Sequence, residues 1–566
     1  MNQPTPAIVP QAAARRLPRL ALLLLCAAYV IPGFLGRDPW KSADMAAFGY
    51  MAELARGATG WLNPQLMGLP SDLDALLPYW LGAWAIQATQ GWLAPDLAVR
   101  VPFALLLALM LVATWYGVYY LARSPQAQPV AFAFGGEASP VDYARAIADG
   151  GLLALIACLG LAQLSHETTP ALAQASFTTL VFFGLAALPY RTLGPGIAIA
   201  AGLAGLALSG SPTMGALFGL GGVLACLADR QTPPGTDEAA SRQRNARWAV
   251  AIALLTAGAA ALAAALDLWR WRIELPQGRW EDIRSLGRLL LWFNWPAWPL
   301  ALWTLWRWRR QLGSRHVLLP LWFALVAVGT TLLTATSDRA LMQGLPALAA
   351  LAAFALPTFR RSAAALIDWF TLLFFSGCAI VIWVVWLAMQ TGFPRQPAAN
   401  VAKLAPGFEP SFSLGALAAA LAATLAWGWL VKWRVGRHRA ALWKSLVLPA
   451  GGAVLSWLLL MTLWLPLLDF ARSYAPLVNN VAARIGQASC VETYGLSRGQ
   501  IAAFQFHAGL ELHPASQEAR CEWLLVDADT QATLSKSVDL KLWTLVASER
   551  RPADKNQDIL VYRRKH

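Results

Sequence analysis

Residues 36–80 read GRDPWKSADMAAFGYMAELARGATGWLNPQLMGLPSDLDALLPYW and lie between the first two strongly apolar runs of the chain. The stretch mixes aromatic and apolar residues with charged residues, among them Asp38, Lys41, Asp44, Glu53, Arg56, Asp72 and Asp74. A spacer between two membrane helices does not need this mixture, and long loops in compact proteins are commonly functional. We therefore interpret residues 36–80 as a folded reaction chamber outside the membrane.

A helix is predicted near the start of this chamber. Apolar residues recur at helical spacing between positions 43 and 56, and Gly57 is a typical helix end. A short helix of this kind is expected to lie in the membrane interface rather than across it. Asp44 falls in its first turn after Ser42, where a carboxylate interacts favourably with the helix dipole. From its position alone, Asp44 is either a capping acid or a site residue.

The composition identifies a polytopic membrane protein. Of the 566 residues, 57% are hydrophobic and 13% are charged, which excludes an ordinary soluble enzyme. The net charge of +14 does not indicate nucleic-acid binding, because the basic residues form short clusters between apolar runs. Such clusters are typical of cytoplasmic loops.

Thirteen apolar runs are predicted to cross the membrane, at residues 17–34, 101–121, 152–164, 171–188, 196–208, 214–227, 248–268, 289–306, 317–334, 341–356, 363–386, 414–431 and 446–468. Residues 77–93 are also apolar, but we place them in the interface, because one more span would move the later basic clusters outside. The amino terminus is then cytoplasmic and the carboxyl terminus is periplasmic. We expect the first run to be a retained anchor, since it has no small-residue cleavage site.

Cysteine usage agrees with this topology. Cys26, Cys158, Cys226 and Cys378 lie in apolar runs, where a lone cysteine behaves as a small hydrophobe. Cys490 and Cys521 are the two cysteines of the terminal tail, which the topology places in an oxidising compartment. We predict that these two form a disulfide.

The order of motifs in the first loop is distinctive. Trp40 precedes Asp44, and these are followed by Ala55-Arg56-Gly57, Trp61-Leu62-Asn63-Pro64 and Pro78-Tyr79-Trp80. This order resembles the first outer loop of the C-type membrane glycosyltransferases, in particular the branch of protein mannosyltransferases and lipid A aminoarabinose transferases. The chain departs from the family pattern at Met45, which replaces a second acid, and at Asp72-Leu73-Asp74-Ala75, which replaces a Glu-Lys-Pro. The chain therefore resembles a divergent member of this glycosyltransferase family.

The resemblance implies site residues. The first acid of the loop is essential in that family, and Asp44 matches it as a base for the acceptor hydroxyl. Arg339 matches a basic residue that contacts the donor phosphate at a later outer turn. Further substrate contacts are expected from Lys41, Arg100 and Glu167.

The predicted outer loop 269–288 is unusually basic, with Arg270, Arg272, Arg279, Arg284 and Arg288. Basic residues are scarce on the outer face of membrane proteins. Two explanations stay open: Arg270 and Arg272 bind the phosphate of an anionic lipid donor, or the loop contacts ordinary anionic headgroups.

The tail, residues 469–566, is expected to form a separate periplasmic α/β domain that follows a transmembrane domain over residues 1–468, whose first outer loop spans 36–99. Strands are predicted at 522–526, 542–547 and 559–562, and a helix at 497–507. The tail shows no nucleotide-binding glycine loop. Asp527 and Asp529 follow a strand and have the oxygen ligands of a metal site, but acids at strand ends are ordinary turn residues.

The expected fold is thus an α-helical polytopic membrane protein of about thirteen spans, of the C-type glycosyltransferase kind, with a small C-terminal α/β domain. The expected activity is transfer of a sugar from a polyprenyl-phosphate donor to a hydroxyl of a lipid, glycan or protein, with inversion, at the outer face of the bacterial inner membrane. No complete metal-ligand set is present, so no cofactor is predicted. The alternatives are a transporter or flippase, and a polysaccharide ligase of the cell envelope.

Overall fold

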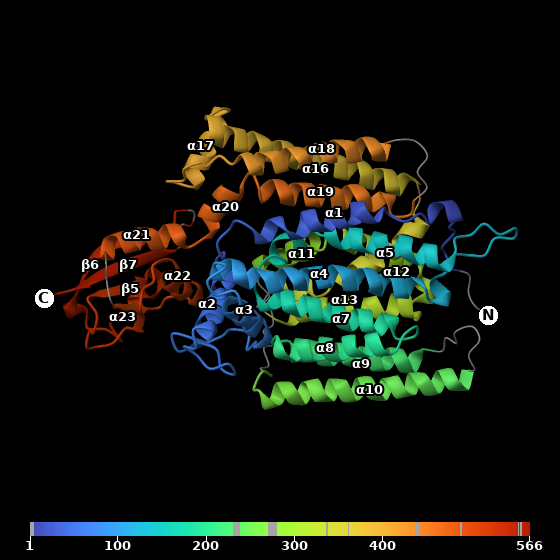
Figure 1. Ribbon diagram of the computed structural model, residues 1–566, viewed down its shortest axis with the longest axis horizontal. Helices are drawn as coiled ribbons and strands as arrows, with labels where there is room; N and C mark the ends of the chain where they lie inside the picture. Colours follow the sequence, from blue (N-terminus) through green and yellow to red (C-terminus); the bar gives the residue numbers. More distant parts are fainter. Residues whose placement is uncertain are drawn as a thin grey trace.

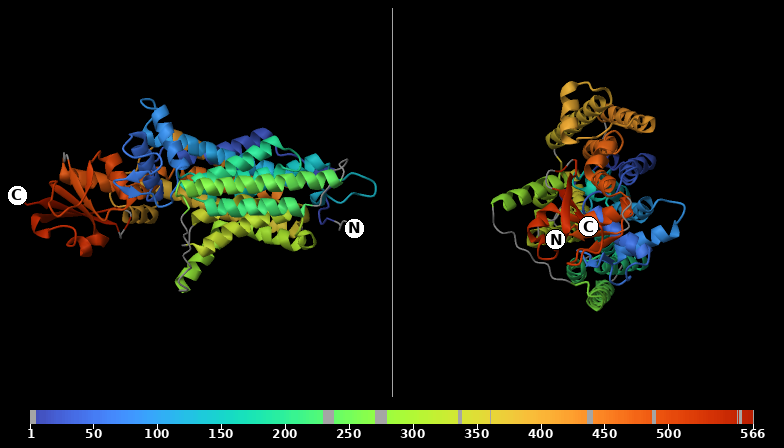
Figure 2. Two further views of the ribbon diagram at one scale, coloured as in Figure 1. Left: turned by 90° about the horizontal axis from the view of Figure 1, so that it is seen from below. Right: turned by 90° about the vertical axis from the view of Figure 1, so that its left-hand side faces the viewer.

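The computed structural model describes residues 5–229, 238–269, 280–334, 338–359, 361–435, 441–486, 490–552, 554 and 557–565. Long helices run side by side along the longest axis, and a small sheet lies beyond one end of this bundle (Figures 1 and 2). The helices before the sheet are α1 (Arg19–Val30), α2 (Ala43–Ala55), α3 (Leu77–Ala88), α4 (Pro95–Ala122), α5 (Pro140–Ile156), α6 (Leu161–Leu164), α7 (Pro170–Ala187), α8 (Leu193–Leu208), α9 (Pro212–Ala228), α10 (Glu238–Ala265), α11 (Trp280–Phe293), α12 (Ala297–Arg307), α13 (Arg315–Leu333), α14 (Asp338–Met342), α15 (Leu345–Ala355), α16 (Arg361–Thr391), α17 (Arg395–Leu404), α18 (Leu414–Val435), α19 (Lys444–Leu460), α20 (Leu465–Arg472) and α21 (Ala475–Ile485).

The described helices are those of a polytopic membrane protein. Among the described residues, six helices are long and apolar enough to cross a membrane, or seven if the bent pair α19 and α20 counts as one span. Every one of the thirteen predicted runs overlaps a helix, but several of these helices are too short to qualify by length. The number of spans therefore stays a prediction. The most apolar window of α7 is 83% buried inside the protein and that of α18 only 11%, so α7 is central and α18 lies at the edge of the bundle.

Four predicted runs are divided between two helices in the structure, among them 152–164 (α5 and α6) and 341–356 (α14 and α15). Residues 289–306 are divided between α11 and α12, because Pro296 stands between them and a proline removes a backbone donor. Residues 446–468 are divided between α19 and α20, whose axes differ by 71°. The helix α5 begins well before the predicted run 152–164, at Pro140, where Ser139 caps it by accepting a hydrogen bond from the Asp142 backbone N–H at 3.3 Å.

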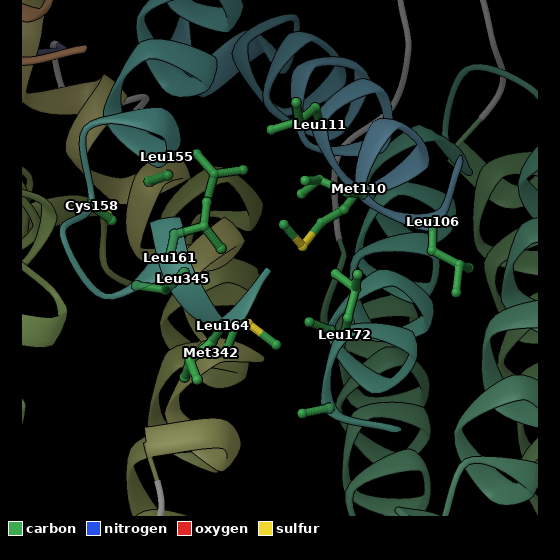
Figure 3. Packing of buried hydrophobic residues seen from close by; sticks show 14 of the residues in the cluster. Leu106, Met110, Leu111, Leu155, Cys158, Leu161, Leu164, Leu172, Met342 and Leu345 are labelled. Carbon is green, nitrogen blue, oxygen red and sulfur yellow. The ribbon is translucent and has the colours of Figure 1, made fainter. Parts of the chain in front are cut away.

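The core beneath the first loop is apolar and close-packed. Figure 3 shows Leu106 and Met110 on α4, with Met110 pointing toward Leu172 of α7 and with Met342 and Leu345 on the other side. All five side chains are buried. This packing fixes the short helix α14, which carries Arg339, relative to the turn between α6 and α7.

The first loop folds as α2, a hairpin of two short strands, β1 (Gln65–Leu66) and β2 (Leu69–Pro70), and α3. It lies between the bundle and the C-terminal sheet (Figure 1). Its acidic turn docks on the turn after α8, where the Leu76 N–H donates to the Leu208 carbonyl at 2.8 Å. Gly210 has a φ of +79°, and a side chain there would lie 2.1 Å from the Leu73 carbonyl oxygen. The structured loop predicted from residues 36–80 is therefore present, and its helix runs from Ala43 to Ala55.

The C-terminal sheet has the strand order β4-β3-β5-β7-β6. Its elements are β3 (Val491–Tyr494), α22 (Arg498–His507), β4 (Leu512–Pro514), β5 (Trp523–Asp527), α23 (Gln531–Leu534), β6 (Trp543–Arg550) and β7 (Asp558–Arg564). Strand β3 pairs in parallel with β4 and β5, and the pairs β5–β7 and β6–β7 are antiparallel. The predicted strands coincide with β5, β6 and β7, whereas the short β3 and β4 were not predicted. The predicted Cys490–Cys521 disulfide is confirmed, with a Cα–Cα distance of 5.3 Å.

Candidate functional site

Asp44 is the centre of a buried polar cluster at the end of the bundle that carries the first loop. The residue is 2% exposed and lies in the first turn of α2. Its Oδ2 accepts hydrogen bonds from Arg37 at 2.8 Å and from the Trp40 backbone N–H at 3.1 Å. Its Oδ1 accepts from the Thr168 backbone N–H at 2.6 Å and from the Thr168 hydroxyl at 2.7 Å. A carboxylate offers about four lone-pair positions, so these donors fill the acceptor capacity of Asp44.

Arg37 holds this cluster together, and the sequence reasoning missed it. Its guanidinium is 2% exposed and pairs with Asp44, while Nε donates to the Gly33 carbonyl at 3.0 Å and Nη2 to the His166 carbonyl at 2.6 Å. The guanidinium also lies 4.7 Å from the centroid of the Trp40 ring, a cation–π contact. A buried charge must be paired, so Arg37 and Asp44 depend on each other.

The neighbours of Asp44 set its protonation state. Burial by itself raises the pKa of Asp44, but the charge of Arg37, the two hydrogen bonds from Thr168 and the charge of Arg100 outweigh it. The net pKa lies below the ordinary aspartate value. Asp44 is therefore ionised at neutral pH, and it is a weak proton acceptor.

Glu167 and Arg339 form the second ion pair of the site. Glu167 Oε2 accepts from Arg339 at 2.9 Å, and Oε1 accepts from the Gln163 amide at 3.3 Å. The Glu167 side chain is 4% exposed and that of Arg339 is 33% exposed. Burial raises the pKa of Glu167, the charge of Arg339 opposes this rise, and the charge of Asp44 adds to it. The structure thus brings three of the predicted site residues, Asp44, Glu167 and Arg339, into one neighbourhood.

Arg100 is buried against the backbone of the first loop and does not lie on an open surface. It is 3% exposed, pairs with Asp96 at 3.3 Å, and donates to the carbonyls of Phe34 and Arg37. These contacts hold the backbone of the segment that carries Arg37. The guanidinium is thus largely engaged within the protein.

Lys41 does not join the cluster. Its ammonium group pairs with Asp554 of the C-terminal region, and Asp554 also pairs with Arg551 at 2.7 Å. Nearby, the Trp40 indole N–H donates to Asp469 at 2.8 Å. The charged residues of the loop start therefore connect the buried cluster to α20 and to the C-terminal region.

His166 is a structural histidine. Its ring is 1% exposed and sits against the Gly33 backbone, where an added Cβ would lie 2.3 Å from the ring. Its ring nitrogens lie 2.5 Å from the Ala162 carbonyl and 3.0 Å from the Tyr29 carbonyl. Burial lowers the pKa of His166 to about 4, so the ring is neutral. Within the described ranges, no group of three His, Cys, Asp or Glu residues is placed to hold a metal ion.

Part of the predicted site lies outside the described residues. Arg270 and Arg272 are in this group, as is Ser337 of the motif before Arg339. Arg284 and Arg288 of the same basic loop lie on α11.

Comparison with known proteins identifies the fold. No protein-family model matches the chain, and no curated protein matches it. The solved structures of ArnT from Cupriavidus metallidurans in the apo state and bound to undecaprenyl phosphate are similar, with TM-scores of 0.61 and 0.62. Each is 15% identical in sequence, and the match covers 96% of this chain and 98% of that chain. The predicted C-type glycosyltransferase fold is therefore confirmed.

A more distant match is the oligosaccharyltransferase of Archaeoglobus fulgidus, solved with a tethered acceptor peptide. Its TM-score is 0.40 at 10% identity, and the match covers 90% of this chain and 69% of that chain.

Proposed function

We propose that this chain is a glycosyltransferase that moves a sugar from a polyprenyl-phosphate donor to an acceptor hydroxyl at the outer face of the bacterial inner membrane. The observation that carries the proposal is that two neighbouring ion pairs, Arg37–Asp44 and Glu167–Arg339, lie at one end of a helical bundle whose fold is similar to that of ArnT. One ArnT structure holds undecaprenyl phosphate. A cation beside a buried carboxylate is what this transfer needs, because a phosphate must leave and a hydroxyl must lose its proton.

Arg339 is proposed to hold the donor phosphate. It is the most exposed of the four charged residues, and guanidinium groups bind phosphate oxygens in a bidentate manner. As the bond from the anomeric carbon to the phosphate oxygen breaks, the electron pair stays on the phosphate, and the charge of Arg339 stabilises it. Polyprenyl phosphate is then the released product.

Glu167 is proposed as the base, which differs from the assignment of Asp44 expected from the resemblance. All acceptor positions of Asp44 are occupied and its pKa is lowered, whereas the pKa of Glu167 is raised. A base with a pKa nearer to neutral accepts a proton more effectively in the transition state. When Arg339 turns to the phosphate, Glu167 loses its cationic partner and its proton affinity rises further.

Asp44 is proposed as a positioning residue. It accepts two hydrogen bonds from Thr168, the residue after Glu167, and its negative charge raises the pKa of Glu167 further. A single displacement on the face opposite the phosphate inverts the anomeric carbon. No cofactor takes part in this proposal.

The topology expected from the sequence belongs to the proposal: thirteen spans, a cytoplasmic amino terminus, and a periplasmic domain over residues 469–566. The two ends of the described chain lie at opposite ends of the long axis, which supports this arrangement (Figure 1). The first loop and the C-terminal sheet lie at the same end of the bundle (Figure 1).

Donor turnover tests the function. The purified protein in lipid nanodiscs is incubated with a panel of polyprenyl-phosphate sugars and a membrane extract, and released polyprenyl phosphate is measured by mass spectrometry. Wild type is expected to release it, Glu167→Gln is not, and Glu518→Gln, an exposed glutamate of the C-terminal region, serves as the matched control. No release from any donor by folded wild-type protein would refute the transferase and favour a transporter.

A further inference from the structure

The guanidinium of Arg472 lies beside the buried cluster and takes no part in its two ion pairs. Arg472 is the last residue of α20, the short helix between the bundle and the C-terminal sheet (Figure 1). Its guanidinium lies 5.3 Å from the centroid of the Trp40 ring, the same ring that Arg37 contacts at 4.7 Å. Arg472 is therefore held at the start of the first loop, next to the Arg37–Asp44 pair.

Arg472 has no carboxylate of its own. Among the residues that the structure describes, its guanidinium makes no hydrogen bond and no ion pair. Asp469, three residues earlier on α20, accepts instead from the Trp40 indole at 2.8 Å and from the Asp38 backbone N–H at 2.9 Å. Arg472 is half-buried, and its guanidinium nitrogens are not sealed from solvent. The guanidinium can therefore bind an anion that reaches it from outside the protein.

The backbone at Arg472 is fixed from two sides. Its carbonyl accepts from the Lys41 backbone N–H of the first loop at 3.0 Å. The carbonyl of the preceding residue, Ala471, accepts from Arg551 of the C-terminal region at 3.0 Å, and Arg551 also lies 5.9 Å from the centroid of the Tyr474 ring. These contacts hold Arg472 in place before a ligand arrives, which lowers the entropy that binding costs.

The favourable charge that acts on Arg472 is that of Glu167. Partial burial removes hydration from the guanidinium, the charge of Glu167 offsets part of this cost, and the charges of Arg37 and Arg551 add to it. Glu167 is already paired with Arg339 at 2.9 Å. One carboxylate thus serves two cations, and an anion that binds next to Arg339 and Arg472 supplies the missing negative charge.

We propose that Arg472 is a second phosphate-binding residue of the donor site, and that it stabilises the charge that appears on the phosphate during transfer. The inference rests on the proposed function and deepens it. A sugar linked to polyprenyl phosphate is a phosphodiester with one negative charge, which Arg339 matches.

The second charge appears when the bond between the anomeric carbon and the phosphate oxygen breaks. The electron pair stays on that oxygen, the acceptor oxygen forms the new bond to the carbon, and the acceptor proton goes to Glu167. The released polyprenyl phosphate is a monoester, whose second pKa is about 6, so it is a dianion at neutral pH. Arg472 stabilises this second charge as it develops.

Arginine modification tests the site in the wild-type protein. The protein in lipid nanodiscs is treated with phenylglyoxal in the presence of undecaprenyl phosphate, of undecaprenol or of no added lipid, and modified peptides are quantified by mass spectrometry. Undecaprenyl phosphate is expected to slow modification of Arg472 by about five-fold or more, whereas undecaprenol changes it by less than about two-fold. Arg520, an exposed arginine of the C-terminal region, is the internal control and should not change. Equal effects of the two lipids, or an Arg472 that does not react without lipid, would overturn the proposal.

Substitution tests the role of the second charge. Arg472→Gln is expected to weaken binding of undecaprenyl phosphate by about ten-fold, and binding of undecaprenyl methyl phosphate, a diester with one charge, by less than about three-fold. The same variant should lower kcat for donor release by about ten-fold or more. Arg472→Lys, which keeps the charge, should lose less than Arg472→Gln, and Arg520→Gln should match wild type. An equal loss of binding for undecaprenol would mean that Arg472 acts only by packing on Trp40, and it would overturn the proposal.

The two levels of inference fail separately. If undecaprenyl phosphate protects Arg339 from modification but does not protect Arg472, only the role of Arg472 fails. If it protects neither arginine and no donor is turned over, the proposed function fails and the role of Arg472 fails with it.

Discussion

Replacing Asp44 by asparagine is expected to destabilise the folded protein strongly. The substitution removes the negative charge from beside Arg37, whose guanidinium is 2% exposed and cannot reach water. The asparagine oxygen accepts from about two of the present donors, and its amide then faces the other two. Breaking one side of a buried ion pair costs about 3–5 kcal/mol.

The local geometry indicates where this cost arises. If the asparagine oxygen faces Arg37 and the Trp40 N–H, its amide meets the Thr168 hydroxyl and N–H. The hydroxyl can rotate, but the backbone N–H cannot, so one buried donor stays unsatisfied at about 1–3 kcal/mol. The uncompensated charge of Arg37 accounts for the rest.

A double-mutant cycle measures this energy. Unfolding free energies of wild type, Asp44→Asn, Arg37→Gln and the double variant are obtained by titration with sodium dodecyl sulfate in mixed micelles. Because each single variant leaves a buried group without its partner, the double variant should cost less than the sum of the two. The exposed Asp529→Asn serves as the control, and it should change the unfolding free energy by about 0.5 kcal/mol or less.

Two results would refute this reasoning. A change of less than about 1 kcal/mol for Asp44→Asn would mean that the pair behaves as an exposed salt bridge. A variant of normal stability that loses activity by roughly 100-fold or more would return the role of base to Asp44.

Further predictions follow from the ion pairs and the disulfide. In wild type, donor release should rise with pH as Glu167 loses its proton; donor release that stays constant across that pH range would contradict the base assignment. Folding raises the pKa of Glu167, so the stability that Glu167 contributes is complete below the ordinary glutamate pKa and is lost as pH rises through the raised pKa. Glu167→Gln should therefore make the unfolding free energy less dependent on pH between these two pKa values. Arg339→Lys, which keeps the charge but loses bidentate binding, should weaken binding of undecaprenyl phosphate by about ten-fold, as measured by native mass spectrometry; equal binding would exclude Arg339 from the phosphate site. Reduction of Cys490–Cys521, which closes a loop of 31 residues, should cost about 3–4 kcal/mol, seen as loss of protection from hydrogen exchange in β3 and β5. Two free thiols in protein from the native compartment would show that this bond does not form there.

The sequence predicted the fold class because membrane insertion depends on local composition. An apolar run long enough to span a bilayer is visible without knowledge of its neighbours. The same holds for the helix of α2, whose spacing and first-turn acid give its bounds to within one residue. The breaks at α11–α12 and α19–α20 were not predicted, since a run of apolar residues does not reveal whether its axis bends.

Asp44, Glu167 and Arg339 were predicted as site residues by their resemblance to motifs, but their mutual contacts were not. Glu167 and Arg339 are 172 positions apart in the chain, and the pattern of neither residue points to the other. Arg37 was missed because a basic residue after a glycine carries no signal in the sequence. Only its burial against Asp44 and the Trp40 ring shows its importance.

What the sequence by itself determined is therefore what depends on near neighbours along the chain: the apolar helices, the short helix of the first loop, and the cysteines of the tail. What only the tertiary structure decided is the state of each charge. The environment of a carboxylate, made here by residues from distant segments, fixes whether it is saturated with donors, as Asp44 is, or held at a raised pKa by burial, as Glu167 is. The free energy of a buried charge depends on the groups within a few ångströms of it, and folding alone brings those groups together.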